Sequence, residues 1–228
     1  MVTVNYLTSK IKNGFTLAEV LITLVIIGVV AALSISPLIN TYVESSTVAK
    51  VKKGLSIIGQ AKKLAEAQNG SIEGWDFGEG ATAETAAQFW NYLKPHISVT
   101  KDCGSSADCY QSDGVYRLNG QLHGYNYNTD TMFYKIILSD GSVMWFRTGG
   151  PSGQGRCSMT EFSVENTCAV FFYDVNGDKK PNTFGKDIFH YIMNTNGVYP
   201  ALDSCTKTSY GIGCAAYIIK NSNMKYLH

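Results

Sequence analysis

The chain has 228 residues, enough for one well-packed globular body and an additional segment but too few for two full-size domains. Lys and Arg total 19 against 18 Asp and Glu, so no overall charge draws the protein to nucleic acid or to an anionic surface. Aromatic residues make up 12% and charged residues only 16%, a balance that suits a β-rich exported domain better than a disordered chain.

The chain begins with a short basic segment, residues 1–14, in which Lys10 and Lys12 are followed by no acidic residue before Glu19. An uncharged stretch then extends over residues 20–43. A stretch of this kind can cross a bilayer as a helix, and we expect the membrane-spanning part at about residues 17–39. The positive charges place the N-terminus in the cytoplasm and everything after the span outside it.

Beyond the span, apolar residues recur at three- and four-residue steps with lysines between them, which predicts an amphipathic helix. The apolar positions are Val48, Val51, Leu55, Ile58 and Leu64, and the lysines are Lys50, Lys52, Lys53, Lys62 and Lys63. We therefore expect one helix over residues 15–68, ended by Asn69-Gly70, with its first half in the membrane and its second half on protein. Pro37 lacks a backbone donor, so it is expected to bend or loosen this helix.

Residues 69–228 are expected to form one globular, β-rich domain. Runs of β-branched and aromatic residues predict strands at 134–138 and 143–147, joined by a hairpin turn at Asp140-Gly141. The other predicted elements are strands at 115–118 and 169–175, a short helix at 83–93 and a flexible loop at 149–155.

All six cysteines lie in this domain, and none has a CxxC or zinc-ligand spacing. An even set in one region of an exported protein predicts disulfides, although many pairings are possible and the alternative is that some are buried free thiols. Closing the shortest loops loses the least entropy. This favours the local pairs Cys103–Cys109, Cys157–Cys168 and Cys205–Cys214.

The segment Lys12-Asn13-Gly14-Phe15-Thr16-Leu17-Ala18-Glu19, with the apolar run behind it, closely resembles the processing site of type IV prepilins and pseudopilins. In that family a basic leader ends in Gly, here Gly14. Phe follows, here Phe15, and then a nearly apolar helix with one Glu at the fifth residue after the cut, here Glu19. The resemblance implies cleavage after Gly14 by a membrane aspartic peptidase on the cytoplasmic side. It also implies methylation of the new Phe15 amine and assembly into a helical filament.

Glu19 is the single charged residue in the predicted span. A carboxylate among apolar side chains near a bilayer requires a partner. The Phe15 ammonium of a neighbouring subunit is one such partner, and it exists only after cleavage, so processing would control assembly. Subunits that repeat by a head-to-tail contact form an open helical polymer, in which the apolar helices pack laterally.

Two simpler explanations account for less of the sequence. A secretory signal has a shorter apolar region with a small-residue cleavage site beyond it. A plain single-span anchor leaves the Gly-Phe-Thr-Leu pattern and the following Glu to chance. The segment departs from many family members in one respect, because Ser36 and not an apolar residue precedes Pro37.

The resemblance implies an α+β, pilin-like fold, in which a long N-terminal helix packs on an antiparallel β-sheet, here with disulfide-stapled loops. It implies a structural subunit of a type IV pilus or a type II secretion pseudopilus. Such a subunit is a single-pass protein of the bacterial inner membrane before it enters a periplasmic or cell-surface filament. Its partners are homologous pilin or pseudopilin subunits, prepilin peptidase, an inner-membrane assembly platform and membrane lipid.

The alternative function is that of a minor tip pilin whose globular domain binds a surface, DNA or a cargo protein. Loss of Lys10 and Lys12 would leave 17 basic against 18 acidic residues, so nucleic acid is not expected as a partner.

A second, weaker resemblance covers residues 174–189, which look like the C-terminal Asp-x-Asn-Gly…Pro-Asn…Gly-x-Asp segment of many pilin-like proteins. Asp174, Asn176 and Asp178 alternate in a way that lets a curled loop direct oxygens at Ca²⁺, with Asp187 as a further ligand. The segment is not an EF-hand. Two interpretations remain: a weak calcium site, or a rigid turn that needs no metal. No other cofactor is predicted.

No enzymatic activity is predicted. The four histidines, His96, His123, His190 and His228, are scattered, and the sequence has no HExxH, GxSxG, P-loop or GxGxxG motif. The three tryptophans, Trp75, Trp90 and Trp145, are expected to pack in a core more often than to line a binding surface.

Overall fold

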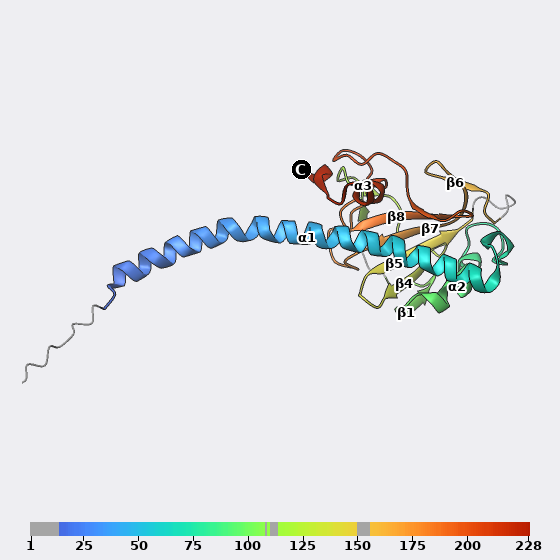
Figure 1. The fold of residues 1–228 in the computed structure, drawn as a ribbon, viewed down its shortest axis with the longest axis horizontal. Helices are drawn as coiled ribbons and strands as arrows, with labels where there is room; N and C mark the ends of the chain where they lie inside the picture. Colours follow the sequence, from blue (N-terminus) through green and yellow to red (C-terminus); the bar gives the residue numbers. More distant parts are fainter. Residues whose placement is uncertain (1–13, 108, 110–113, 150–155) are drawn as a thin grey trace, which may run out of the picture. The chain divides into compact units, whose positions relative to one another are not determined.

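The structure is a computed structural model that describes residues 14–107, 109, 114–149 and 156–228. The chain divides into two units, Met1–Val43 and Glu44–His228. Helix α1, Leu17–Asn69, begins in the first unit and ends in the second (Figure 1). The described residues do not include Lys10 and Lys12 of the predicted leader. They also do not include most of the loop predicted at 149–155.

The second unit contains an antiparallel seven-stranded sheet and a separate two-stranded sheet. The strands are β1 Val99–Gly104, β2 Val115–Tyr116, β3 Leu122–His123, β4 Tyr134–Leu138, β5 Val143–Thr148, β6 Met159–Glu161, β7 Val164–Asp174, β8 Ile188–Asn194 and β9 Val198–Pro200. The helices after α1 are α2 Ala83–Leu93 and α3 Cys214–Asn221, with 3₁₀ turns at Ile72–Gly74, Lys94–His96 and Lys225–Leu227.

The strand order of the large sheet is β1-β4-β5-β7-β8-β9, and β6 also pairs with β7. The predicted hairpin is confirmed, because β4 and β5 pair directly and Gly141 takes the positive φ of 81° that the turn requires. The strand predicted at 115–118 is shorter than expected and stops at Tyr116. Strand β7 begins five residues earlier than predicted, at Val164.

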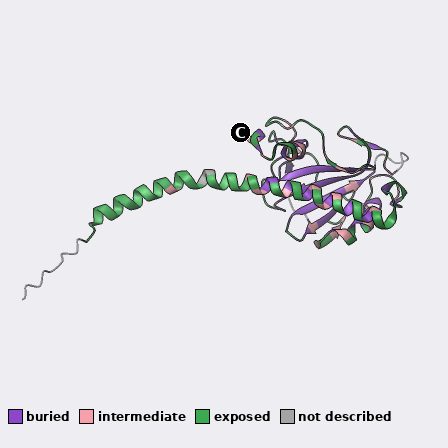
Figure 2. Ribbon diagram, in the orientation of Figure 1, coloured by how far each residue is buried: buried purple, intermediate pink, exposed green. Residues whose placement is uncertain are grey.

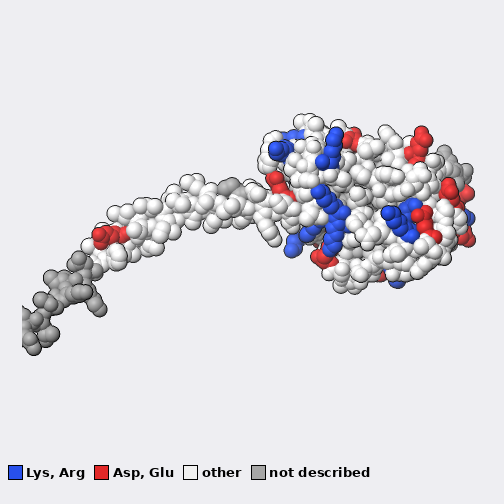
Figure 3. Space-filling view, in the orientation of Figure 1, with Lys and Arg blue, Asp and Glu red and all other residues white. Residues whose placement is uncertain are grey.

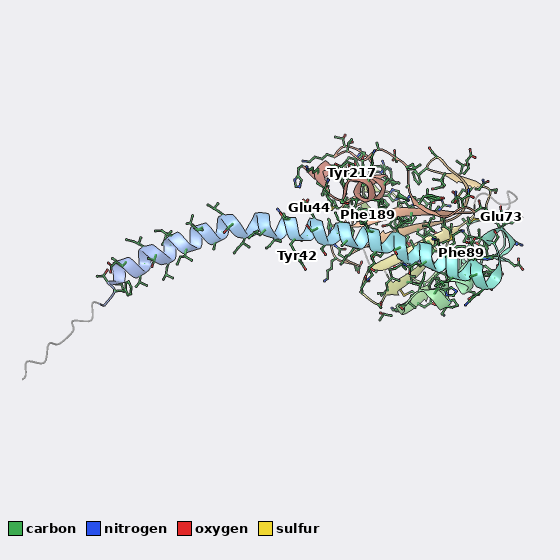
Figure 4. All side chains as sticks on the ribbon, viewed as in Figure 1. Tyr42, Glu44, Glu73, Phe89, Phe189 and Tyr217 are labelled. Carbon is green, nitrogen blue, oxygen red and sulfur yellow. A yellow bond between two sulfur atoms is a disulfide. The ribbon has the colours of Figure 1, made fainter. Side chains whose placement is uncertain are left out.

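The second half of α1 covers one face of the large sheet, lying across β4, β5, β7 and β8 (Figure 1). Figure 2 shows buried residues alternating with exposed ones along this part of the helix. The buried apolar residues of α1 are Val48, Val51, Ile58, Ala61 and Ala65. Phe189 on β8 and Phe89 on α2 belong to the same core (Figure 4).

The prediction of which α1 residues contact the domain is wrong at the C-terminal end of the helix. Leu64 is 51% exposed and Ala65 takes the buried position, because a helix turns about 100° per residue and Ala65 continues the line of Val51 and Ile58. Lys62 was expected on the outer face but is buried, and its ammonium bonds Glu66 and the Thr195 carbonyl.

Small residues allow α1 to lie close to the sheet. A Cβ atom on Gly54 would stand 2.6 Å from Cδ1 of Tyr173 on β7, a separation that real side chains do not adopt. The absence of a side chain at Gly54 therefore sets the distance between helix and strand at this point.

The other face of the sheet is covered by loops. Along β5 and β7 the side chains alternate, so that Phe146 and Phe171 face α1 whereas Trp145 and Phe172 face the loops. All three tryptophans are buried, as the sequence predicts.

Three disulfides join neighbouring segments of this unit. They are Cys103–Cys109, Cys157–Cys168 and Cys205–Cys214, the three local pairs, and they leave no free cysteine among the described residues.

Candidate processing and assembly site

The predicted cleavage point lies at the start of the described chain and is open to solvent. Gly14, Phe15 and Thr16 precede the first helical residue, Leu17. Phe15 is 87% exposed, and apart from its chain neighbours none of the described residues has an atom within 4 Å of the position that a Cβ on Gly14 would take. An exposed segment of this kind, outside the helix, is accessible to a peptidase.

Thr16 and Glu19 form a reciprocal hydrogen-bonded pair at the N-terminus of α1. The Thr16 amide and hydroxyl both donate to Oε2 of Glu19, each over 2.8 Å, and the Glu19 amide donates to the Thr16 hydroxyl over 3.2 Å. This is a capping box, in which Thr is the N-cap residue and Glu is three positions later. Glu19 also lies in the first turn of the helix, where the helix dipole favours a negative charge.

The capping box was not predicted, although the Thr-x-x-Glu spacing before an apolar run is its usual signature. It means that Glu19 has a role within a single chain. One carboxylate oxygen, Oε2, is occupied by Thr16, and no hydrogen bond from the described residues reaches the other, Oε1. The second oxygen is available to an external donor.

The part of α1 between Glu19 and Glu44 presents a nearly uninterrupted apolar surface. Figure 3 shows this stretch free of charged side chains after Glu19. Its large apolar side chains are more than 40% exposed, and Tyr42 near its end is likewise exposed (Figure 4). Among the described residues, α1 is the one helix long and apolar enough to cross a membrane. The helix continues through Pro37 without interruption.

The four candidate calcium ligands lie at the end of β7, where Asp174 is the last residue, and in the loop that joins β7 to β8. Asp187 is buried, and its oxygens accept hydrogen bonds from the amides of Asn182 and Thr183, at 2.8 and 2.6 Å, and from the Asn176 side chain at 3.2 Å. Burial raises the pKa of Asp187, whereas these donors favour its ionised form. Asp174 accepts a hydrogen bond from the Asn176 amide at 3.1 Å.

The fourth candidate ligand, Asp178, lies on the exposed side of this loop. Within the described part of the chain, no three His, Cys, Asp or Glu side chains are grouped to hold a metal. The donors to the Asp187 carboxylate are two main-chain amides and one side-chain amide.

The histidines are not grouped. His190 is fully buried, whereas His228 is exposed and lies 2.7 Å from Glu44. His96 and His123 are on separate segments of the domain.

Residues 9–35 match the family model described as the prokaryotic N-terminal methylation motif. No curated protein and no solved structure matches the chain. The match includes Gly14, Phe15 and Glu19, and it confirms that the chain carries the N-terminal motif of prepilin-type proteins, a class that is generally not enzymatic.

Proposed function

We propose that this protein is a structural subunit of a type IV pilus or of a type II secretion pseudopilus. Prepilin peptidase cleaves it after Gly14, and the new Phe15 amine is methylated. The single observation that carries the proposal is the methylation motif at 9–35 placed at the start of a 53-residue helix. A membrane crossing needs only about 20 residues, so the rest of that helix has another role.

Each part of the chain has a function in this proposal. The basic leader keeps the N-terminus in the cytoplasm, and the apolar part of α1 holds the subunit in the inner membrane with the disulfide-bonded domain outside. During assembly, the inner-membrane platform transfers the apolar surface of α1 from lipid to the helices of neighbouring subunits.

Glu19 has two successive partners in this scheme. In the single subunit Thr16 occupies one of its oxygens. In the filament, the Phe15 ammonium of the neighbouring subunit pairs with the other oxygen, and this contact neutralises a carboxylate in apolar surroundings. The uncleaved chain lacks that amine, so it enters the membrane but not the filament.

The capping box allows the charge of Glu19 to be tested separately from its cap. Gln is also found at the third helical position of capping boxes, where its side-chain oxygen accepts the hydrogen bond from the N-cap amide. Glu19→Gln therefore keeps the cap and removes the negative charge. We expect the Glu19→Gln protein to be cleaved and inserted into the membrane. Its incorporation into filaments should fall at least about tenfold, because one ion pair between subunits is lost. Thr16→Val is the matched control, because it removes the cap hydroxyl and keeps the charge.

The measurement is the amount of subunit in sheared, purified filaments relative to the membrane, with mass spectrometry of its N-terminal peptide. Filaments that contain an N-methylated Phe15 terminus in the wild type and the Thr16→Val variant support the proposal. Normal incorporation of the Glu19→Gln protein would refute the ion pair, and a mature terminus other than Phe15 would refute the processing.

A further inference from the structure

A pocket of about 630 Å³ opens on the sheet face opposite α1. Its lining includes His123, Tyr125 and Tyr127 from the chain at and after β3. The large sheet provides Arg147, Phe172 and, on β6, Glu161, and a later segment provides Tyr210. Its volume lies in the range of about 300–1,000 Å³ typical of small-molecule sites. Because α1 packs on the other face, contacts made by α1 do not cover this pocket.

Aromatic rings belong to half of the residues that line the pocket. Tyr125 lies parallel to His123 and to Tyr127, with ring centroids 5.9 Å apart in both pairs, and it is 47% exposed. Tyr127 is held behind it by edge contact with Phe133 at 5.0 Å and by Phe172 at 5.1 Å. The wall therefore offers an open aromatic surface on a rigid support.

Polar groups in the pocket are fixed in place before any ligand binds. Arg147 donates to the Gly149 carbonyl at 3.3 Å and to Oε1 of Glu161 at 3.1 Å. No hydrogen bond from the described residues reaches the second oxygen of Glu161. His123 is held between the hydroxyls of Tyr127 and Tyr210. Fixed groups of this kind reduce the entropy lost on binding.

The pocket carries no net charge. Arg147 and Glu161 neutralise one another, and both side chains are about one-fifth exposed. Burial lowers the pKa of His123. It also lowers the pKa of His190, which lies against Phe172, to about 3. Both imidazoles are therefore neutral at pH 7. Among the residues that line the pocket, no charged side chain is therefore left unpaired for an anion or a cation to bind. Arg117 lies over the ring of Tyr210, 4.4 Å from its centroid, but is not one of the lining residues.

We propose that this pocket binds a neutral carbohydrate, with one sugar ring lying on Tyr125 and its hydroxyl groups bonded to Glu161 and Arg147. A pyranose has an apolar face of C–H groups that complements the negative face of an aromatic ring. Its hydroxyls both donate and accept, which matches a carboxylate oxygen beside a guanidinium group.

Other ligand classes fit the pocket less well. A quaternary ammonium group suits an aromatic wall but finds no free negative charge in this pocket, because Glu161 is already paired with Arg147. A purely apolar ligand would remove the Arg147–Glu161 pair from water and would offer no hydrogen bonds in place of those lost to water. The carbohydrate uses both the aromatic surface and the polar pair.

Ligand-observed NMR on the disulfide-bonded full chain, solubilised in a detergent without a sugar headgroup, tests the proposal. The probes are methyl β-galactoside, methyl β-glucoside and N-acetylglucosamine, with choline as a cationic comparison. For a ligand of monosaccharide size we expect a dissociation constant on the order of 1 mM. Titration to about 20 mM would therefore reach saturation.

Two variants alter the pocket in different ways. Tyr125→Ala removes the exposed ring, and Glu161→Gln removes the charge while keeping the size of the side chain. We expect each to weaken sugar binding by about tenfold, the equivalent of one lost contact. Tyr199→Ala, an exposed tyrosine on β9 that is outside the pocket, is the control and should bind as the wild type does.

Saturable binding of at least one sugar that Tyr125→Ala and Glu161→Gln weaken, and Tyr199→Ala does not, supports the proposal. No sugar binding at 20 mM, about twentyfold above the expected constant, would overturn it. It would also be overturned if choline bound and the sugars did not, or if the pocket variants bound as the wild type does. None of these results bears on filament assembly, so the two proposals fail independently.

Discussion

The hydroxyl of Tyr191 on β8 donates a hydrogen bond of 2.7 Å to the main-chain carbonyl of Val51 on α1. Both residues are completely buried, and the bond joins the N-terminal helix directly to an interior strand of the sheet. It satisfies a hydroxyl that would otherwise have no partner in an apolar core.

Tyr191→Phe should lower the free energy of unfolding of the globular unit by about 0.5–1.5 kcal/mol, the usual net contribution of one hydrogen bond. For a domain of this size that corresponds to a melting temperature about 2–4 °C lower per kcal/mol. Near-UV circular dichroism during heating measures the shift. Tyr199→Phe changes an exposed tyrosine and should leave the melting temperature unchanged.

Gly54→Ala should destabilise the same contact by about 1–3 kcal/mol, because the new methyl group overlaps the Tyr173 ring and forces helix and strand apart. Gly59→Ala is the matched control on the same helix, where no atom lies within 4 Å of the added Cβ. That variant should be more stable by up to about 1 kcal/mol through helix propensity alone. Equal effects of the two substitutions on the melting temperature would contradict the close packing at Gly54.

The ion pair between Lys53 on α1 and Asp140 in the β4–β5 turn predicts a dependence on acid pH. Its two charged atoms are 2.6 Å apart. Partial burial alone would raise the pKa of Asp140, but hydrogen bonds from Lys53 and Ser142 and the Lys53 charge lower it to about 2. A depressed carboxyl pKa stabilises the folded state above the unfolded value near 4. That stabilisation is lost as the pH falls from about 4 towards 2.

Lys53→Met should therefore cost about 0.5–1 kcal/mol at pH 7, a figure reduced for solvent screening because Lys53 is about half exposed. The difference from the wild type should shrink between pH 4 and pH 2 in urea-unfolding experiments. Lys63→Met removes an exposed lysine from the same helix and should show no such difference. A Lys53→Met effect that does not change with pH would exclude the ion pair as its cause.

The stability of the β7–β8 loop should depend on Asp187 whether or not calcium is present. Asp187→Ala removes the acceptor for three N–H groups, so we expect it to destabilise the domain by about 2–4 kcal/mol in the presence of a chelator. Asp203→Ala, in an exposed loop, should cost little by comparison.

Adding Ca²⁺ distinguishes the two interpretations of this loop, a calcium site and a turn that needs no metal. Because both oxygens of Asp187 already accept hydrogen bonds, we expect no rise in melting temperature on adding millimolar Ca²⁺. Calcium held by Asp174, Asn176, Asp178 and Asp187 would instead raise it, with a dissociation constant of about 10⁻⁴ M or weaker. Calorimetry of the wild type and of Asp174→Ala decides between them, since that substitution would abolish a calcium effect.

Peptide mapping without reduction should recover the three local disulfides, Cys103–Cys109, Cys157–Cys168 and Cys205–Cys214. Their sequence separations of 6, 11 and 9 residues correspond to a stabilisation of about 2–3 kcal/mol each in the chain-entropy description. Recovery of long-range pairs, or of free thiols in the oxidised protein, would be inconsistent with this arrangement.

Features that depend on residues close together in the chain could be predicted from the sequence alone. The prepilin-type motif around Gly14, helix α2 and the hairpin through Asp140-Gly141 are all local patterns, and each was predicted from the sequence. The start of α1 also belongs to this group. Thr16 and Glu19 are three residues apart, so their capping box could have been predicted from spacing alone.

Tertiary structure decided which surfaces meet. Strand β8 is buried along its whole length, so its sequence lacks the polar–apolar alternation by which a half-exposed strand is recognised, and it was not predicted. The line of contact on α1 passes through Gly54 because Tyr173, more than a hundred residues later, lies against it. The aromatic pocket likewise brings His123 together with Tyr210 across 87 residues. Contacts at such separations depend on the packing of the whole sheet, and no local pattern specifies them.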